Sequence, residues 1–232
     1  MGRLYPRMRE RPPEFRVNPE SPLYNGLVIA GLGGAGSIGS NWYPDASPYK
    51  AHGTLYNMDP NTDWVWVPEL SRFALDFDGS NDYVTVPRGS HDWTGTVTVA
   101  CWYFPRVTYN GCTFGFNYDR EFDCRLMYRN TIWYQSNGAG GHNEYKFPAT
   151  SLNAWGHNCI FRDSAAKQIK KYNNGNPVGS AAIYTNTPYS STYPFYIGRR
   201  HTGVYENAII SDLCVWLRVL FPAEISALAD PS

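Results

Sequence analysis

Residues Ala74–Pro87 read ALDFDGSNDYVTVP. Hydrophobic and polar residues alternate on both sides of a centre that is rich in Gly, Ser, Asn and Asp. Alternation with a period of two is typical of a strand with one buried face, and Gly79 and Asn81 are typical of a turn. The stretch therefore predicts a strand, a turn and a second strand.

The same kind of pattern continues along the rest of the chain. Thr96–Phe104 begins in strict alternation, which predicts a half-buried strand. Asn174-Gly175 predicts a two-residue hairpin, because a type I′ turn needs a positive φ at both central residues. Phe221–Ala229 predicts a short helix with a proline in its first turn. Further strands are expected at Trp155–Asp163, Lys167–Asn174, Tyr193–Arg200 and Ala208–Leu220.

Composition agrees with an all-β domain. The 232 residues include 21 Gly and 17 Pro, and turn signals recur about every 8 to 12 residues, as in a sandwich or barrel. The net charge of zero gives no argument for a nucleic-acid partner, and no apolar run is long enough for a membrane span. The five cysteines are an odd number, so we expect small buried hydrophobic residues, with one or two disulfides as the alternative.

Five segments, taken in order, resemble one family. The first segment, Ala74–Pro87, is similar to a segment of laminin G-like domains, which are concanavalin A-like jelly rolls of the lectin and glucanase type. The resemblance implies a two-sheet antiparallel jelly roll of about 12 to 14 strands over residues 21–232. The other four segments are YPDASPYKAHGTLYNMDP (43–60), KKYNNGNPVGS (170–180), FYIGRR (195–200) and IISDLCVWLRVLFPAEISALA (209–229).

The resemblance also implies a structural calcium ion. Asp45 and Asp212 occupy the matching positions, but the acidic neighbours that relatives often have there are missing. Calcium takes six to eight oxygen ligands, several of them carboxylates. We expect calcium at these two residues, with the alternative that they cap turns.

Residues 1–20 differ from the rest of the chain. Residues 1–16 carry five Arg and two Glu, a net charge of 5 − 2 = +3, and lack hydrophobic periodicity. We expect an extended arm that precedes the domain and packs on its own domain or on a neighbouring subunit, with a solvated tail as the alternative. The residues expected to make assembly contacts are Arg3, Tyr5, Arg7, Arg9, Arg11 and Phe15.

Aromatic side chains are the candidates for ligand binding. Trp64 and Trp66 are two residues apart and would share one face of a strand, and Trp133-Tyr134 precedes a Gly-rich polar loop. Exposed aromatic rings stack on sugar faces, so these four residues are candidate glycan-binding residues. The alternative is that they fill the core.

Three motifs that suggest catalysis do not complete a catalytic set, and we expect no enzyme activity. The GxGxxG match at Gly31–Gly36 is followed by no helix, as a dinucleotide site requires. Glu121 and Asp123 fit the start of the glucanase pattern, but Leu126 stands where that pattern has its second catalytic carboxylate. His142-Asn-Glu144 has no accompanying P-C-x-x-C zinc motif.

These observations predict a non-catalytic binding or assembly module. The arm favours a virion surface protein, such as a capsid decoration or fibre subunit, whose partners are its own copies or other capsid subunits. The alternative is a lectin-like carbohydrate-binding module or adhesin. The absence of an apolar signal segment at the N-terminus predicts a location on the virion surface, or an extracellular one reached by a non-classical route.

Overall fold

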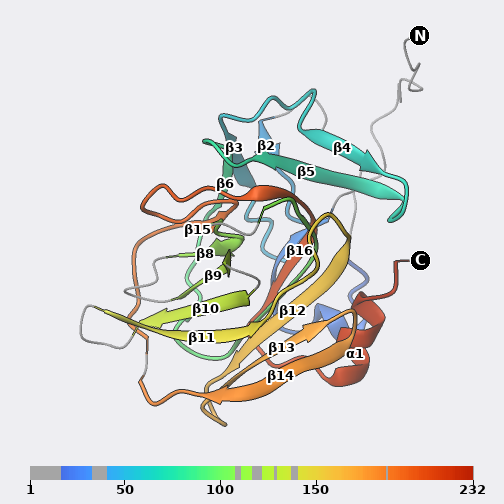
Figure 1. Ribbon diagram of the computed structural model, residues 1–232. Coiled ribbons are helices and arrows are strands. Elements are labelled where there is room, and N and C mark those ends of the chain that lie inside the picture. Colours follow the sequence, from blue (N-terminus) through green and yellow to red (C-terminus); the bar gives the residue numbers. More distant parts are fainter. Residues whose placement is uncertain are drawn as a thin grey trace.

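A computed structural model describes residues 17–32, 41–107, 111–116, 122–127, 130–136, 141–186 and 188–231, with the backbone alone at 123 and 125–127. Over these residues the chain forms two eight-stranded antiparallel sheets, a short 3-10 helix and one α-helix (Figure 1). The prediction of an all-β jelly roll with a C-terminal helix is confirmed. The sixteen strands exceed the expected 12 to 14 because strands of only two residues are counted among them.

Sheet A contains the longest strands. From one edge to the other its order is β14 (Asn176–Ile183), β13 (Gln168–Asn173), β12 (Gly156–Asp163), β7 (Val97–Pro105), β16 (Asn207–Trp216), β5 (Arg72–Asp78) and β4 (Trp64–Val67). The eighth strand, β1 (Leu27–Gly31), pairs with the second half of β16, while β5 pairs with its first half. A register shift between Ser211 and Cys214 separates the two halves of β16.

Sheet B packs against sheet A. Its order is β11 (His142–Pro148), β10 (Asn130–Ser136), β9 (Phe122–Met127), β8 (Phe114–Gly115), β15 (Phe195–Ile197), β6 (Tyr83–Val86), β3 (Gly53–Tyr56) and β2 (Trp42–Tyr43). The stretch Ala74–Pro87 thus leads from β5 in sheet A to β6 in sheet B. It forms the predicted strand, turn and strand, but as a crossover between the sheets and not as a hairpin.

The predicted hairpin at Asn174-Gly175 is confirmed. Asn173 pairs with Asn176, and the two residues between them have φ values of 47° and 77°. Both values lie in the left-handed region that a type I′ turn requires.

The core has two main layers. The larger lies between the sheets, and a second covers the outer face of sheet A beneath α1 (Pro222–Leu228) and the segment that contains η1 (Pro22–Tyr24). The expectation that the strand within Thr96–Phe104 is half-buried is therefore wrong, since eight of the nine residues of β7 are buried. The five cysteines are all buried thiols, as predicted.

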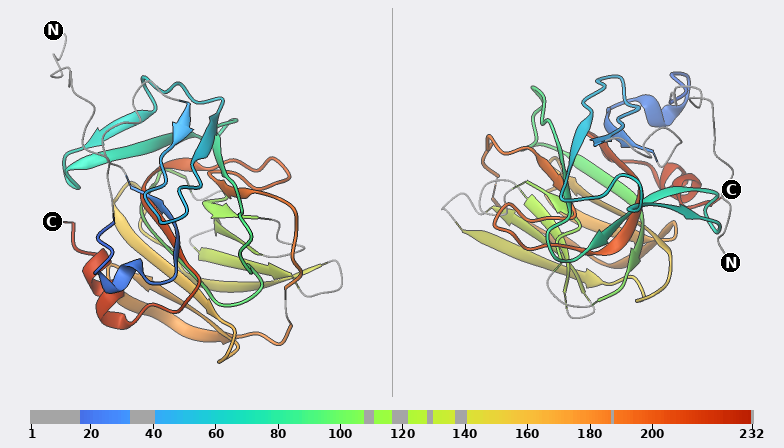
Figure 2. Two further views of the ribbon diagram at one scale, coloured as in Figure 1. Left: turned by 180° about the vertical axis from the view of Figure 1, so that it is seen from behind. Right: turned by 90° about the horizontal axis from the view of Figure 1, so that it is seen from above.

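Arg218 holds these covering elements together. Its guanidinium pairs with Glu224 of α1 at 2.6 Å and donates to the carbonyl oxygens of Pro22 and Asn25 at 2.8 and 2.7 Å. Figure 2 shows α1 and the η1 segment on the same side of the molecule. No helix of the described residues is long and apolar enough to cross a membrane.

Candidate functional site

Three of the four aromatic residues that the sequence suggested for glycan binding are buried. Trp64, Trp133 and Tyr134 are 6%, 0% and 3% exposed, whereas Trp66 is 47% exposed. Trp133 stacks on Phe122 in the core between the sheets, with ring centroids 4.5 Å apart. The prediction that these three rings face a ligand is wrong for this structure, because core packing covers them.

Asp45 is buried, and its carboxylate is surrounded by donors. Oδ1 accepts hydrogen bonds from the backbone N–H groups of Ala30 and Ser47 at 2.8 and 2.9 Å. Oδ2 accepts from Ser47 Oγ and the Ala51 N–H at 2.7 and 2.8 Å. N–H groups thus stand where a cation would have to lie, so this arrangement does not fit calcium.

Asp212 lies in the bulge of β16, with a φ of 49°, and forms an ion pair with Arg72. The described residues contain no group of three or more His, Cys, Asp or Glu side chains placed to hold a metal ion. Calcium at Asp45 and Asp212 stays a prediction, and the backbone N–H groups that Asp45 accepts from favour turn capping for that residue.

Several other predictions lie outside the described residues. This holds for the assembly residues of the arm (Arg3, Tyr5, Arg7, Arg9, Arg11 and Phe15), for most of the Gly-rich loop and for Glu121. His142 and Glu144 lie on the edge strand β11, where Glu144 is within 3.6 Å of Lys146 Nζ. Such a pair is typical of a solvated strand face.

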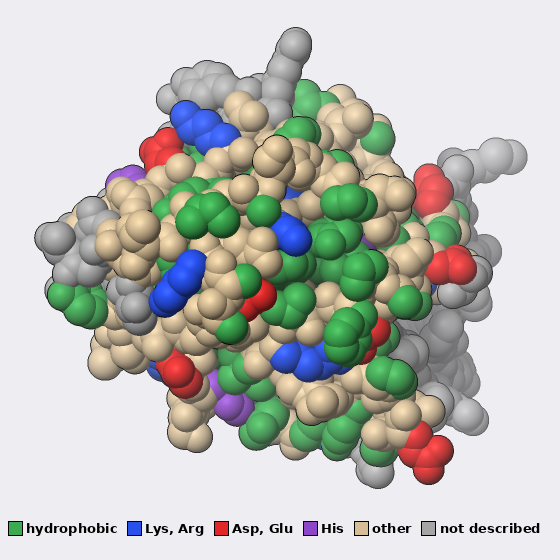
Figure 3. Space-filling view, turned by 90° about the horizontal axis from the view of Figure 1, so that it is seen from below, with side chains coloured by type: hydrophobic (Ala, Val, Ile, Leu, Met, Phe, Trp, Pro, Cys, Tyr) green, Lys and Arg blue, Asp and Glu red, His purple; other side chains and the backbone are tan. Residues whose placement is uncertain are grey.

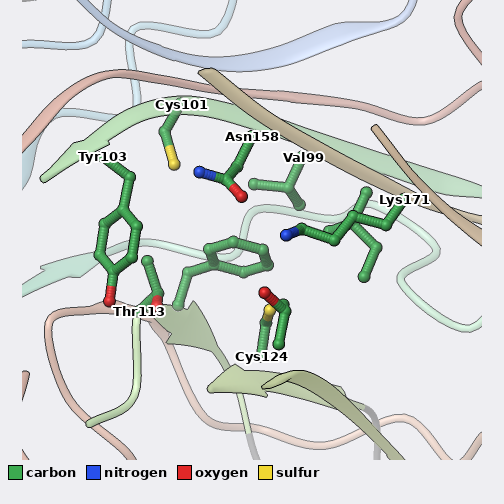
Figure 4. A pocket seen from close by; sticks show the side chains of 10 residues that line it. Val99, Cys101, Tyr103, Thr113, Cys124, Asn158 and Lys171 are labelled. Atoms are coloured by element: carbon green, nitrogen blue, oxygen red, sulfur yellow. The ribbon is translucent and has the colours of Figure 1, made fainter. Parts of the chain in front are cut away.

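The cavity between the sheets is too small for an organic ligand. Its volume is about 20 Å³, and its lining includes Val99, Cys101 and Ile160. Figure 4 shows Asn158 and Lys171 pointing into this space. Lys171 Nζ donates to the Pro148 carbonyl at 2.8 Å, and burial lowers its pKa to about 8. A space of this size holds about one water molecule.

The outward face of sheet B carries a cluster of aromatic residues that sequence reasoning missed. In β3, β6 and β15, buried residues alternate with exposed or partly exposed ones. Leu55, Val84 and Ile197 point into the core, so the intervening residues Tyr56, Tyr83 and Tyr196 point outward. Since these strands are neighbours in the sheet, their tyrosines meet on one surface.

Tyr83 lies at the centre of this cluster. The Tyr56 ring stacks on it, with centroids 4.7 Å apart and planes 4° from parallel. The Arg199 guanidinium carbon lies 4.4 Å from the Tyr83 centroid, and 5.5 and 5.6 Å from the centroids of Tyr196 and Tyr205. Because Tyr56 covers one face of the Tyr83 ring, the guanidinium must lie over the other. We call Tyr56, Tyr83, Tyr196, Tyr205 and Arg199 the tyrosine platform.

Small hydroxyl side chains extend the platform across the sheet. Strand pairing places Trp42 opposite Thr54, Thr54 opposite Thr85, and Thr85 opposite Tyr196. Paired residues of an antiparallel sheet share one face, so this row also points outward. Trp42 is 39% exposed. The row therefore presents two threonine hydroxyls between exposed aromatic rings.

The electrostatics of the platform come from one charge. Burial raises the pKa of Tyr196, and the Arg199 charge partly opposes this rise. At neutral pH the tyrosine is therefore uncharged, and Arg199 carries the positive charge. Its Nε and Nη2 atoms donate to the carbonyl oxygens of Arg200 and His201 at 3.1 and 3.4 Å.

The surface seen from below in Figure 3 carries scattered hydrophobic side chains. Groups of hydrophobic side chains there are separated by polar residues and by Lys, Arg, Asp and Glu (Figure 3). That face offers no single broad apolar area comparable with a protein interface core.

Comparison with known families agrees with this architecture. The family model described as the concanavalin A-like lectin/glucanases superfamily matches residues 78–226, or 149 of the 232 residues. The chain belongs to this superfamily. The resemblance inferred from five short segments is thereby confirmed. The match includes Tyr83, Tyr196, Arg199 and Tyr205 of the platform, whereas Tyr56 precedes it.

Several solved structures have the same fold as this chain. The binding domain of Paraclostridial Mosquitocidal Protein 1 aligns with a TM-score of 0.67 and 17% identity, over 89% of this chain and 52% of that one. A structure from work on botulinum neurotoxin type C, whose cell entry depends on two ganglioside molecules, aligns with a TM-score of 0.67 and 12% identity, over 89% and 51%. The binding domain of botulinum neurotoxin DC in complex with rat synaptotagmin II gives 0.65 and 11%, over 88% and 51%.

These identities are low enough that the likeness shows the fold alone, and the chain spans about half the length of these structures. No curated protein matches the sequence of this concanavalin A-like domain.

Proposed function

We infer that this domain is a non-catalytic binding module that recognises a carbohydrate on the tyrosine platform. The observation that carries this proposal is the outward-facing cluster around Tyr83, which combines the exposed ring of Tyr56 with tyrosine and threonine hydroxyls. Ring faces pack against the C–H groups of a pyranose, and neighbouring hydroxyls satisfy its polar groups. A sugar therefore fits the chemistry of this surface.

A binding role also agrees with the sequence of β9. A retaining glycosidase needs two carboxylates about 5 to 5.5 Å apart. Leu126 stands where the glucanase pattern has its second catalytic carboxylate, so this strand lacks half of the required pair. The superfamily description includes lectins as well as glucanases, and a lectin is the reading that this sequence supports.

The first test compares two exposed aromatic sites. Tyr56→Ala is expected to weaken binding to any glycan that the domain captures on a glycan array by about tenfold, because Tyr56 is the exposed ring of the platform and stacking on an aromatic ring contributes roughly 1 to 1.5 kcal/mol. Trp66→Ala is the matched control, because Trp66 is an exposed ring on β4 outside the platform. We expect this control to keep its affinity within about twofold.

Titration calorimetry with the best array hit gives both affinities, and thermal unfolding verifies that each variant is folded. Loss of binding in Trp66→Ala together with full binding in Tyr56→Ala would move the site to β4. Absence of glycan binding by the unmodified domain would contradict the proposal.

The assembly role stays a prediction that rests on the charge of residues 1–16. If the arm contacts a neighbouring subunit on a virion surface, the full chain forms a defined oligomer and a chain lacking residues 1–20 is a folded monomer. Light scattering after size-exclusion chromatography measures both masses. A double substitution, Tyr5→Ala with Phe15→Ala, tests the two aromatic contacts without shortening the chain. Equal masses for the full and shortened chains would contradict self-assembly through the arm.

A further inference from the structure

Arg199 differs from other arginines of the domain in its surroundings. Arg72, Arg106 and Arg218 each form an ion pair with a carboxylate, namely Asp212, Asp76 and Glu224. Arg199 has no acidic partner among the described residues, and its contacts are tyrosine rings and two backbone carbonyl oxygens. Within the part of the chain that the structure describes, no carboxylate therefore neutralises the positive charge of the platform.

The guanidinium keeps hydrogen-bonding capacity for a ligand. An arginine side chain has five N–H donors. One donor on Nε and one on Nη2 are used by the carbonyl oxygens of Arg200 and His201. The remaining three donors include both on Nη1, and two adjacent N–H groups of a guanidinium match the two oxygens of a carboxylate.

The position of the guanidinium is fixed before any ligand arrives. It lies among the rings of Tyr83, Tyr196 and Tyr205, with 4.4 to 5.6 Å between its central carbon and the ring centroids. A side chain that is already ordered loses less entropy on binding, and arginine is more weakly hydrated than lysine. Both effects favour recognition of an anion beside the ring faces.

We propose that the ligand of the platform is an acidic saccharide, whose carboxylate pairs with Arg199 while a sugar ring packs on the exposed Tyr56 ring. This inference rests on the proposed carbohydrate-binding function and specifies its substrate class. Uronic and sialic acids share the required group, a carboxylate attached to a pyranose. A neutral sugar leaves the Arg199 donors to water and gains only the stacking and hydroxyl contacts.

The test uses pairs of probes that differ in the acid. One pair is tetragalacturonic acid and its methyl ester, and the other is 3′-sialyllactose and lactose. The unmodified domain is expected to bind the acidic member of at least one pair about tenfold more tightly, because a hydrogen bond to a charged group contributes about 1.5 kcal/mol. This preference should shrink as NaCl rises from 50 to 500 mM, since salt screens exposed charges.

Variants at Arg199 separate charge from shape. Arg199→Gln is expected to abolish the preference for the acid, whereas Arg199→Lys retains part of the preference. Lys146→Gln is the control, because this side chain is 58% exposed on β11 of the same sheet and its loss changes the net charge equally. We expect this control to keep the preference.

The outcomes distinguish the inference from the function on which it rests. If the acid and neutral members of each pair bind equally, with Tyr56→Ala weakening both, the acidic specificity is overturned and carbohydrate binding stands. If Lys146→Gln removes the preference as fully as Arg199→Gln, the specificity comes from net charge and not from Arg199. If the unmodified domain binds neither member of either pair and no other glycan, both proposals fail together.

Discussion

Substituting Gly198 with alanine is expected to destabilise the folded domain by about 4 kcal/mol. Gly198 has a φ of 75°, a conformation that side chains other than glycine adopt only with strain. An added Cβ would also lie 2.3 Å from Cδ1 of Phe77, which is completely buried between the sheets. The ring cannot move without displacing its core neighbours, so the two penalties add.

Gly203→Ala is the matched control for this prediction. Gly203 also has a positive φ, of 87°, but its added Cβ would meet nothing closer than the Tyr205 ring at 3.9 Å. Only the backbone penalty of about 1 kcal/mol is expected there. Urea unfolding of both variants measures the difference. Equal losses of stability would show that the Phe77 contact adds nothing to the cost.

A second large change in stability is expected at the side chain of Glu206, which is 1% exposed. Burial raises its pKa from 4.5 to about 7, although the Thr113 hydroxyl donates to Oε2 at 3.0 Å and partly opposes the rise. Below pH 4.5 both the folded and the unfolded chain bind the proton, so burial of this carboxyl does not lower the free energy of unfolding through ionisation. Between pH 4.5 and 7 the unfolded chain releases the proton first, so the folded state loses stability as the pH rises.

Glu206→Gln removes this penalty because the amide stays neutral at every pH. The variant is expected to match the unmodified domain within about 1 kcal/mol at pH 4.5 and to exceed its stability by about 3 kcal/mol at pH 8. Free energies of unfolding in urea at the two pH values give the comparison. Glu144→Gln on the exposed face of β11 removes the same charge, and we expect changes below about 0.5 kcal/mol for it. An equal effect of Glu206→Gln at both pH values would argue against an ionised buried carboxyl.

Local signals in the sequence were sufficient for single turns and for the helix, whereas the jelly-roll fold was inferred from the family resemblance. Asn174-Gly175 specifies its turn through backbone conformation, and Pro222 marks the start of the helix, so neither depends on distant contacts. Burial was harder to predict. β7 alternates in sequence, yet it is buried on both sides because α1 and the η1 segment cover the outer face of sheet A.

The tyrosine platform could not be predicted for a related reason. The alternation in Tyr83-Val84-Thr85-Val86 does indicate which residues share a face. It does not say that β6 lies between β3 and β15, and this order is what brings Tyr56 to Tyr196 across 140 residues of sequence. The sequence around Trp133 does not distinguish a ligand-binding residue from a core residue. Only the packing of sheet B on sheet A shows that Trp133 belongs to the core.

The position of strand β16 affects the order in which sheet A can form during translation. It lies in the middle of sheet A, with β7 along one side and β5 and β1 along the other, yet it is the last strand in the chain. During translation these three strands therefore present unpaired edges until residues 207–216 have left the ribosome. Open edges pair readily with other chains, and non-local pairing of this kind is slow. Newly synthesised copies thus complete sheet A only after translation of β16.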